Sequence, residues 1–408
     1  MINEIIMRKI SYLLLVLVST LLLAWQLPKL FRLATDERVS YPFTYYSCVI
    51  NDFCRVEASE QAVKRLDRQG REYSEAEFDS ILPMFNYRQL VKDGRLPDSL
   101  RGVPVSAKLI SHHSFFHRYR PADWQRPAIA LFPLFESMSG KVDLEMPNDV
   151  FQLKDSLVFF VPGSNSIDHD KSRQFNEVFQ RRGFIAPARL VAGTPSARKA
   201  YDEGYFVVDD KHQIFHMKMV NGKPFIKNTA IDSALQVKQI ITTEFPDRLF
   251  YGFLFDKEDQ MYIITTDGYR LQKVEIPPFR LADCQLFVMA NLFYWNVQVT
   301  SAEGQTIYAL DAKTLQKVDE VSYPRLEGGK THWMPWLFPF VVSFESSFTQ
   351  FVAPEIEFTG WRFLPLSLVL GLMALLMAPR SKRDYLSVLW VIITGLYGFI
   401  AYLLLRKK

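Results

Sequence analysis

Apolar residues gather at the two ends of the chain, and alternating apolar and polar positions fill the middle. Residues 10–27 contain no charged side chain, and residues 362–378 and 385–405 are two further apolar stretches. Because a helix rises about 1.5 Å per residue, stretches of this length suit the hydrocarbon layer of a membrane. We predict one N-terminal transmembrane helix and a C-terminal transmembrane helical hairpin, whose helices are joined by the basic segment PRSKRDY.

The first apolar stretch also has the form of a secretory signal peptide, because Arg8 and Lys9 precede a short apolar core. Two features favour an uncleaved anchor with a tail at residues 1–9. No small-x-small cleavage site follows the core, and no cysteine stands there to take a lipid. Lysines and arginines nearly balance across the predicted helices. The basic hairpin turn favours a multi-pass protein of the bacterial inner membrane with its large middle region in the periplasm.

Three similar units follow one another between residues 203 and 321. Each joins a run of aromatic or β-branched residues to a polar turn, a second alternating run and a second turn. An aromatic residue of the second run recurs at Phe215, Tyr262 and Tyr308, with spacings of 47 and 46. A period of about 46 residues built from strands and turns is typical of β-propeller blades, in which copies of one small sheet cover each other's faces.

We therefore predict a mainly β protein with a propeller-like ectodomain. Residues 154–331 carry the repeats, and an approximate fourth unit begins at residues 156–161. Residues 40–153 form a β-rich N-terminal part with short helices. Only three or four blades are visible in the sequence. A partial propeller, or a β-sandwich followed by a propeller, fits almost as well.

Two short helices are indicated within these regions. Ser74 and Glu77 form a capping box, which predicts a helix that ends at Pro83. Residues 172–182 carry apolar side chains on one helical face and are followed by Gly183. We interpret the second helix as an insertion on a blade.

Residues 332–361 lead into the C-terminal apolar stretches and are rich in aromatic residues. Trp333, Trp336 and Trp361 suit the membrane interface, where aromatic rings bridge the wet and the apolar layers. The alternative is a last core strand with ordinary packing aromatics. The sequence favours neither interpretation.

The composition narrows the class of partner. Aromatic residues make up 14% of the chain, with 33 Phe and 18 Tyr, which favours strands over helices. The net charge of +4 is spread along the sequence, and no Lys/Arg run between residues 40 and 360 is long enough to follow a phosphate backbone. We expect a membrane and membrane-protein partners, and no nucleic acid.

The three cysteines leave two interpretations open. Cys48 and Cys54 are close enough for a disulfide if the segment between them turns, which an exported domain permits. Cys284 stands alone in a strand-like run. Three small buried thiols are the alternative.

Histidines provide the most enzyme-like pattern, SHHSFFHRYR, which contains His112, His113 and His117. Metal ligands need converging nitrogens, and a spacing of i to i+4 provides them on a helix. These three histidines are the only candidates for metal ligands. The interleaved aromatic residues indicate a strand or loop instead of a helix, so polar strand residues are the better interpretation. His212 and His216 are interpreted as surface residues of one strand, too far apart for one metal ion. No common nucleotide-binding or hydrolase motif occurs, and we expect no cofactor.

Four stretches carry a resemblance to a known family: YYSCVINDFCR from Tyr45, LPDSLRG from Leu96, LFPLFESMSGKVDLEMPNDVF from Leu131 and FVAPEIEFTGWRF from Phe351. Through them the chain resembles a family of uncharacterised bacterial membrane-anchored proteins that is described as a domain of unknown function. The likeness spans nearly the full length. It implies no catalytic residue, and it implies an association with ABC-type permease and ATPase subunits.

These observations predict a non-enzymatic, membrane-anchored binding or scaffold protein. It would be an accessory component of a transport or cell-envelope complex, with an ABC-type transporter as the candidate. The alternative is an envelope hydrolase or metal-dependent enzyme with its site in a propeller pocket. Convergence of His112, His113 or His117 with carboxylates at a cleft would favour that alternative, and scattered imidazoles would disfavour it.

Overall fold

The computed structural model describes most of the chain as two compact units. The described residues are 2–35, 40–58, 62–124, 130–138, 140–141, 143–199, 201–326, 333–344, 354–377 and 385–405. Pro42–Pro324 form one unit, here called the β unit. Met1–Tyr41 and Arg325–Lys408 together form the other, here called the helical unit. Both predicted parts of the ectodomain, residues 40–153 and 154–331, therefore fall largely within one unit.

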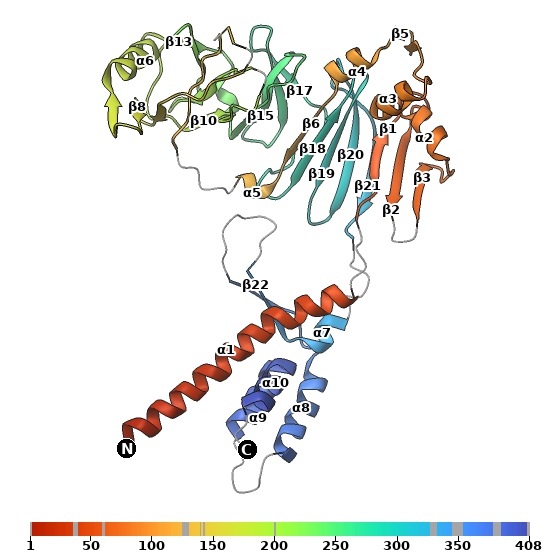
Figure 1. Cartoon of the computed structure of the whole chain (residues 1–408), viewed down its shortest axis with the longest axis vertical. Coiled ribbons are helices and arrows are strands. Elements are labelled where there is room, and N and C mark those ends of the chain that lie inside the picture. The colour runs from red at the N-terminus through yellow and green to blue at the C-terminus, as the bar shows by residue number, and fades with distance from the viewer. Residues whose placement is uncertain are drawn as a thin grey trace. The chain divides into compact units, whose positions relative to one another are not determined.

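The β unit consists of small antiparallel sheets whose strands are mostly close in sequence (Figure 1). The prediction of a mainly β protein is confirmed. Its earlier sheets are formed by β1 (Phe43–Tyr46), β2 (Phe53–Ala58) and β3 (Val63–Asp67), by β4 (Ser99–Leu100) and β5 (Val103–Pro104), and by β7 (Val150–Leu153), β8 (Leu157–Val161) and β9 (Ser166–Asp168).

Each of the three aligned sequence units supplies the last three strands of a four-stranded meander, whose first strand precedes the unit. The strands are β10 (Leu190–Gly193), β11 (Tyr205–Val208), β12 (Ile214–Val220) and β13 (Lys223–Asn228); β14 (Gln239–Thr242), β15 (Phe250–Phe255), β16 (Met261–Thr265) and β17 (Leu271–Lys273); and β18 (Gln285–Ala290), β19 (Tyr294–Thr300), β20 (Gly304–Asp311) and β21 (Lys317–Pro324). The recurring aromatic residues Phe215, Tyr262 and Tyr308 all lie on the third strand of their meander. The strand and turn pattern is thus as predicted.

The last meander contains a strand from far upstream. β6 (Phe115–Tyr119) pairs antiparallel with β18, where Phe115 lies opposite Ala290. The sequence repeat gave no sign of this fifth strand, because its partner lies more than a hundred residues away.

Hydrophobic clusters join the sheets of the β unit in series. The β7–β9 sheet and α6 (His169–Arg181) pack on the β10–β13 sheet, which packs on β14–β17, which packs on β18–β21. The β18–β21 sheet also packs on β1–β3. A small sheet that is apolar on both faces is stable only when neighbours cover it. None of these clusters joins β1–β3 to β7–β9, so the described residues do not show the closed ring of a propeller.

The described part of the β unit also contains the short α-helices α2 (Glu75–Ile81), α3 (Pro83–Lys92), α4 (Ala107–His113) and α5 (Pro121–Trp124), and the 3-10 helix η1 (Ser233–Leu235). The predicted capping box is present, since the Ser74 side chain accepts from the Glu77 N–H and Glu77 accepts from Ser74. Pro83 begins α3 rather than only ending α2, because a proline at the first helical position needs no hydrogen-bond partner. The predicted helix at residues 172–182 is α6.

The helical unit differs from the predicted spans in two places. Its elements are α1 (Ile2–Thr35), α7 (Met334–Leu337), β22 (Phe340–Ser343), β23 (Glu355–Phe358), α8 (Leu364–Met377), α9 (Tyr385–Thr394) and α10 (Leu396–Leu405). α1 includes most of the expected N-terminal tail and continues through Pro28. The helix expected at residues 385–405 is two helices, interrupted at Gly395, whose φ is +59°. Residues 378–384, with the basic turn, lie outside the described residues.

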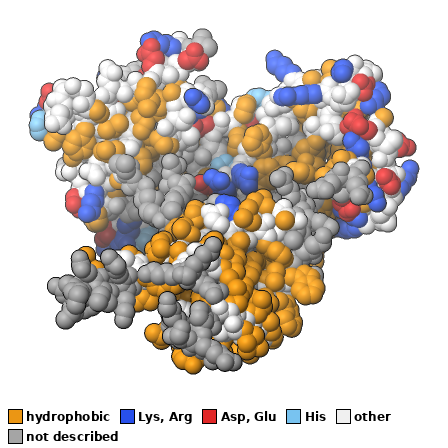
Figure 2. All heavy atoms as spheres, turned by 60° about the horizontal axis from the view of Figure 1, so that its bottom comes forward, with side chains coloured by type: hydrophobic (Ala, Val, Ile, Leu, Met, Phe, Trp, Pro, Cys, Tyr) orange, Lys and Arg blue, Asp and Glu red, His pale blue; other side chains and the backbone are white. Residues whose placement is uncertain are grey.

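α1 packs on the C-terminal elements through its second half. Ala24 is fully buried in a cluster with Phe338 and Tyr397, and the Trp390 Nε1–H donates to Thr20 Oγ1 at 3.1 Å. The stretch Ile10–Phe31 is long and apolar enough to cross a membrane. Figure 2 shows hydrophobic side chains over much of the helical unit's surface.

Candidate functional site

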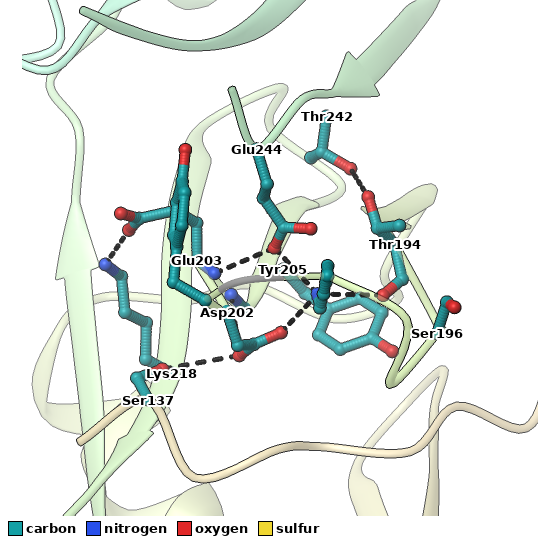
Figure 3. Close-up of polar contacts among 12 residues, drawn as sticks. Ser137, Thr194, Ser196, Asp202, Glu203, Tyr205, Lys218, Thr242 and Glu244 are labelled. Carbon is teal, nitrogen blue, oxygen red and sulfur yellow. Dashed lines mark hydrogen bonds and ion pairs between the residues drawn. The ribbon is translucent and has the colours of Figure 1, made fainter. Parts of the chain in front are cut away.

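Three charged side chains are buried together where the β10–β13 and β14–β17 sheets meet (Figure 3). The Lys199 ammonium donates to Asp202 Oδ1 at 2.6 Å, to Glu244 Oε1 at 2.7 Å and to the Thr194 carbonyl at 2.9 Å. The exposed side-chain fractions of Lys199, Asp202 and Glu244 are 6%, 1% and 5%. We call these three residues the Lys199 cluster.

The loop between β10 and β11 is shaped to present this cluster. Asp202 Oδ2 accepts from the Gly204 N–H at 3.0 Å, and Glu244 Oε1 also accepts from the Glu203 N–H at 2.9 Å. Gly204 has a φ of +68°, and a Cβ there would lie 2.1 Å from the Met217 carbonyl oxygen. Only glycine fits that close approach. The cluster therefore fixes the β10–β11 loop against Glu244, two residues after the end of β14.

The charges of the Lys199 cluster favour a structural role over a catalytic one. An ammonium has three N–H donors and no lone pair, and Lys199 uses all three donors on acceptors of the protein, so it has none left for a ligand. Burial raises the pKa of Glu244, and the hydrogen bond from Lys199 opposes that rise. Two carboxylates facing one ammonium leave one net negative charge in a nearly dry site. The arrangement locks two loops together.

A second polar group adjoins the cluster through Glu203. The Glu203 side chain pairs with Lys218, and its carbonyl accepts from His216 Nε2 at 2.5 Å. His216 Nδ1 lies 2.9 Å from the Tyr269 hydroxyl, and its ring stacks on Phe206 at 4.5 Å. Burial lowers the pKa of His216 to about 3, so this imidazole is neutral. His216 is fully buried, and its interpretation as a surface residue was wrong, because the next sheet covers that face of β12.

The three histidines predicted as metal candidates lie on different elements. His112 and His113 end α4, and His117 lies on β6. His113 Nδ1 is 4.0 Å from Asp247 Oδ2, whereas the His117 ring lies 5.4 Å from the Phe253 ring. Burial lowers the pKa of His117 to about 4, and its Nε2 has no hydrogen-bond partner. In the described part of the chain, no three His, Cys, Asp or Glu side chains are grouped as metal ligands.

Cys48 and Cys54 are free, buried thiols, which corresponds to the second of the two interpretations left open. Cys48 packs with Tyr294, and Cys54 packs with Phe78 in a different hydrophobic cluster. Burial raises the pKa of Cys48 to about 11 and that of Cys54 to about 12. Cys284 is also buried, and burial raises its thiol pKa. Thiols held neutral in this way are poor nucleophiles.

The predicted interface tryptophans are exposed side chains of the helical unit. Trp333 caps α7, Trp336 lies within it, and Trp361 precedes α8. None of the three lies in a core strand. Contact with a membrane interface stays a prediction. Residues 327–332 and 345–353 around them lie outside the described residues.

Sequence reasoning did not find the Lys199 cluster. Lys199 and Glu244 are 45 residues apart and belong to different meanders. The sequence Asp202-Glu203-Gly204 indicated a turn with a residue at positive φ. Nothing in the spacing indicated its cationic partner.

Most of the β unit matches one protein family. Residues 43–310 match the sequence profile of the family described as Domain of unknown function (DUF4857). The chain belongs to this family. The match begins at β1 and ends within β20, so it covers nearly all of the β unit and none of the helical unit. The predicted membership of an uncharacterised family is confirmed, and an association with ABC-type transporters stays a prediction.

Three solved structures show weak likeness, each at 10% identity. The β-propeller domain of Cps50 (Swd1) from Myceliophteria thermophila has a TM-score of 0.25, and the match covers 50% of this chain and 58% of that one. PorZ of the type-IX secretion system of Porphyromonas gingivalis has a TM-score of 0.23, with 71% of this chain and 27% of that one covered. The dihydro-heme d1 dehydrogenase NirN in complex with DHE also has a TM-score of 0.23, with 63% of this chain and 62% of that one covered. The chain thus spans less than two thirds of each. TM-scores this low carry no argument about fold or function. No curated protein matches the chain.

Proposed function

We propose that this protein is a non-enzymatic binding or scaffold protein anchored in the bacterial inner membrane. The observation that carries the proposal is the apolar surface of the helical unit. Large apolar side chains are exposed along α1 and along α8, among them Leu13, Leu14, Leu22, Leu372 and Leu376. Water would disfavour such a surface, whereas lipid accommodates it.

The packing of α1 supports an uncleaved anchor over a signal peptide. Thr20 and Ala24 are buried, and the Phe31 ring contacts the Phe338 ring with a centroid distance of 5.7 Å. Removal of α1 by a signal peptidase would uncover the cluster that these residues share with β22 and α10. A cleaved leader has no such role in the mature protein.

The pairing of buried charges supports a binding role over catalysis. In the described residues, Lys199 and its carboxylates satisfy one another. Of the three candidate histidines in this part of the chain, only His113 lies near a carboxylate, with Asp247 at 4.0 Å, and no third ligand joins this pair. No observation favours the alternative of an envelope hydrolase or metal enzyme. The proposed role is that of an accessory component of a transport or cell-envelope complex, with an ABC-type permease as the candidate partner.

Membrane attachment is tested on the full chain expressed in bacteria. Membranes are washed with alkaline carbonate and then dissolved in detergent. We expect the protein in the carbonate pellet and in the detergent extract. A protein that stays in solution without detergent would refute the anchor.

Orientation and partnership need separate experiments. Alkaline phosphatase fused after Lys408 should be active if the β unit and the C-terminus are both outside. Chemical cross-linking at native expression should recover a membrane-protein complex that contains this chain. Recovery of the chain alone would contradict the scaffold role and leave the anchor standing.

A further inference from the structure

Among the described residues, the last strand of the helical unit pairs with another strand along one edge only. β23 pairs with β22 on one side, and all four of its residues are exposed. The exposed fractions of Ile356 and Phe358 are 64% and 53%. Exposed strand edges are templates for the addition of another strand.

The register defines which backbone groups face the uncovered edge. The Thr359 N–H donates to the Pro339 carbonyl at 3.1 Å, and Phe340 lies opposite Phe358 in the same register. Hydrogen-bonded and non-hydrogen-bonded pairs alternate in an antiparallel ladder. Glu357 and Glu355 therefore direct their backbone groups to β22. Ile356 and Phe358 direct theirs to the uncovered edge.

The side chains of β23 alternate in character between the two faces. Glu355 and Glu357 lie on one face, and Ile356 and Phe358 lie on the other. Neither carboxylate has an ion-pair partner among the described residues of the chain. The strand thus presents an apolar face, an acidic face and outward-pointing peptide groups within one short segment.

We propose that this edge binds an extended segment of a partner protein by strand addition. The segment carries Lys or Arg at alternate positions opposite Glu355 and Glu357, and apolar residues opposite Ile356 and Phe358. Phe358 contacts the Trp361 ring at 5.1 Å, next to the start of α8, so the partner is a membrane-associated protein. The inference rests on the proposed scaffold function and names the chemistry of its partner.

Charge and backbone chemistry disfavour two other occupants. Pairing of two β23 strands in an antiparallel dimer would bring four carboxylates together, and like charges across a strand pair are destabilising. A lipid surface would leave the outward N–H and C=O groups of Ile356 and Phe358 unpaired in its apolar layer. Anionic headgroups would also repel the two glutamates.

The test uses the full chain in nanodiscs of uncharged phosphatidylcholine. The probe is a fluorescein-labelled peptide of alternating Lys and Val, and its matched control alternates Glu and Val. We expect fluorescence anisotropy to report binding of the Lys-Val peptide alone. Equal binding of the two peptides, or binding of neither, would overturn the inference.

Two substitutions locate the binding at the edge. Ile356→Pro removes an outward N–H and leaves the pairing with β22 in place, because proline is tolerated on an open edge. We expect it to weaken Lys-Val binding by about tenfold or more, the effect of about one lost hydrogen bond. Ile356→Val is the control and should bind like the wild type. Glu357→Lys should abolish the preference between the two peptides, because the new ammonium offsets the remaining Glu355 carboxylate.

The outcomes separate this inference from the proposed function. A chain that enters nanodiscs but binds neither peptide refutes only the strand addition. A chain that is soluble without lipid refutes the membrane anchor, and with it the proposed function on which this inference rests. A dimer that Ile356→Pro abolishes would assign the edge to a second copy of the chain. Lys-Val binding unchanged in Ile356→Pro would place the peptide elsewhere, and both results overturn the inference.

Discussion

Buried polar side chains of the β unit differ in how completely they are paired. Lys199 uses all three of its donors, and His216 uses both ring nitrogens. The His117 side chain is partly buried, and its Nε2, which is shielded from water, has no hydrogen-bond partner. Pairing decides the cost of a substitution, because removing one partner of a satisfied group leaves the other unpaired. Replacing Lys199 is therefore expected to destabilise the protein, and replacing His117 is expected to stabilise it at acidic pH.

Lys199→Met should strongly destabilise the β unit. It leaves Asp202 and Glu244 buried without their cation, a loss typical of a broken buried pair at about 3–5 kcal/mol. The measurement is urea unfolding of the full chain in detergent, followed by tryptophan fluorescence. Lys238→Met is the control, since the half-exposed pair with Asp259 should contribute less than about 1 kcal/mol. Equal losses in the two variants would contradict the role of the cluster.

His117→Phe should make the protein more resistant to acid. Burial holds the pKa of His117 at about 4, below the unfolded value of 6.5, so the unfolded chain binds a proton first as pH falls. The contribution of neutral His117 to the free energy of unfolding is fully present above pH 6.5 and is lost as the pH falls toward 4. At pH 5 the loss is roughly 2 kcal/mol. The Phe variant avoids this loss.

Urea midpoints at pH 7.5 and pH 5 measure the difference. His216 titrates in the same direction in both proteins, so the comparison isolates His117. At pH 7.5 the variant should be no less stable than the wild type, because the ring lies against Phe253 and Nε2 is unpaired. An identical acid dependence in the two proteins would contradict the buried position.

At the scale of elements, the first two meanders share a turn as well as their order of strands. Asp209 Oδ1 accepts from the Gln213 N–H in the turn after β11, and Asp256 Oδ1 accepts from the Gln260 N–H after β15. The two aspartates are 47 residues apart, the same interval as between Phe215 and Tyr262. An aspartate that binds backbone N–H groups closes such a turn. The period therefore reflects local hydrogen bonding in addition to hydrophobic alternation.

Gly252→Ala should separate β14 from β15. A Cβ at this position would lie 2.2 Å from the Ile241 carbonyl oxygen, so one strand must move. We expect a loss of about 3 kcal/mol and faster amide exchange in both strands. Gly268→Ala is the control. Its Cβ meets nothing within 4 Å, and its φ of +69° costs only about 1 kcal/mol. Unchanged exchange in β14 for Gly252→Ala would contradict the close approach.

At the scale of the whole molecule, the apolar surface and the family domain belong to different units. The family match covers residues 43–310, and the helix that could cross a membrane is Ile10–Phe31. The described residues of the β unit form their own series of hydrophobic clusters. A unit with its own core is expected to fold by itself.

Residues 42–324 expressed alone should therefore be soluble without detergent. Circular dichroism should show β structure, and the far-ultraviolet signal should be lost in one cooperative step on heating. Size-exclusion chromatography checks that the fragment is a discrete species. Aggregation of the fragment, or rescue only by detergent, would show that the helical unit completes its core.

The sequence by itself determined the features that depend on near neighbours. These are the apolar ends, the capping box of Ser74 and Glu77, and the strand and turn units with Phe215 and Tyr262 on equivalent strands. Helix and strand periods, caps and turns are set by residues a few positions apart. A reader of the sequence can recognise them without knowing what lies beside them.

Only the tertiary structure decided the contacts between distant segments. β6 joins β18, Lys199 meets Glu244, Cys48 and Cys54 pack in separate clusters, and a helix expected to be continuous is interrupted at Gly395. Which faces meet depends on the shape and burial of whole sheets and helices, and many pairings satisfy the same local pattern. Burial then determines which partner each polar side chain has, how far its pKa is shifted, and how much stability is lost when the side chain is removed.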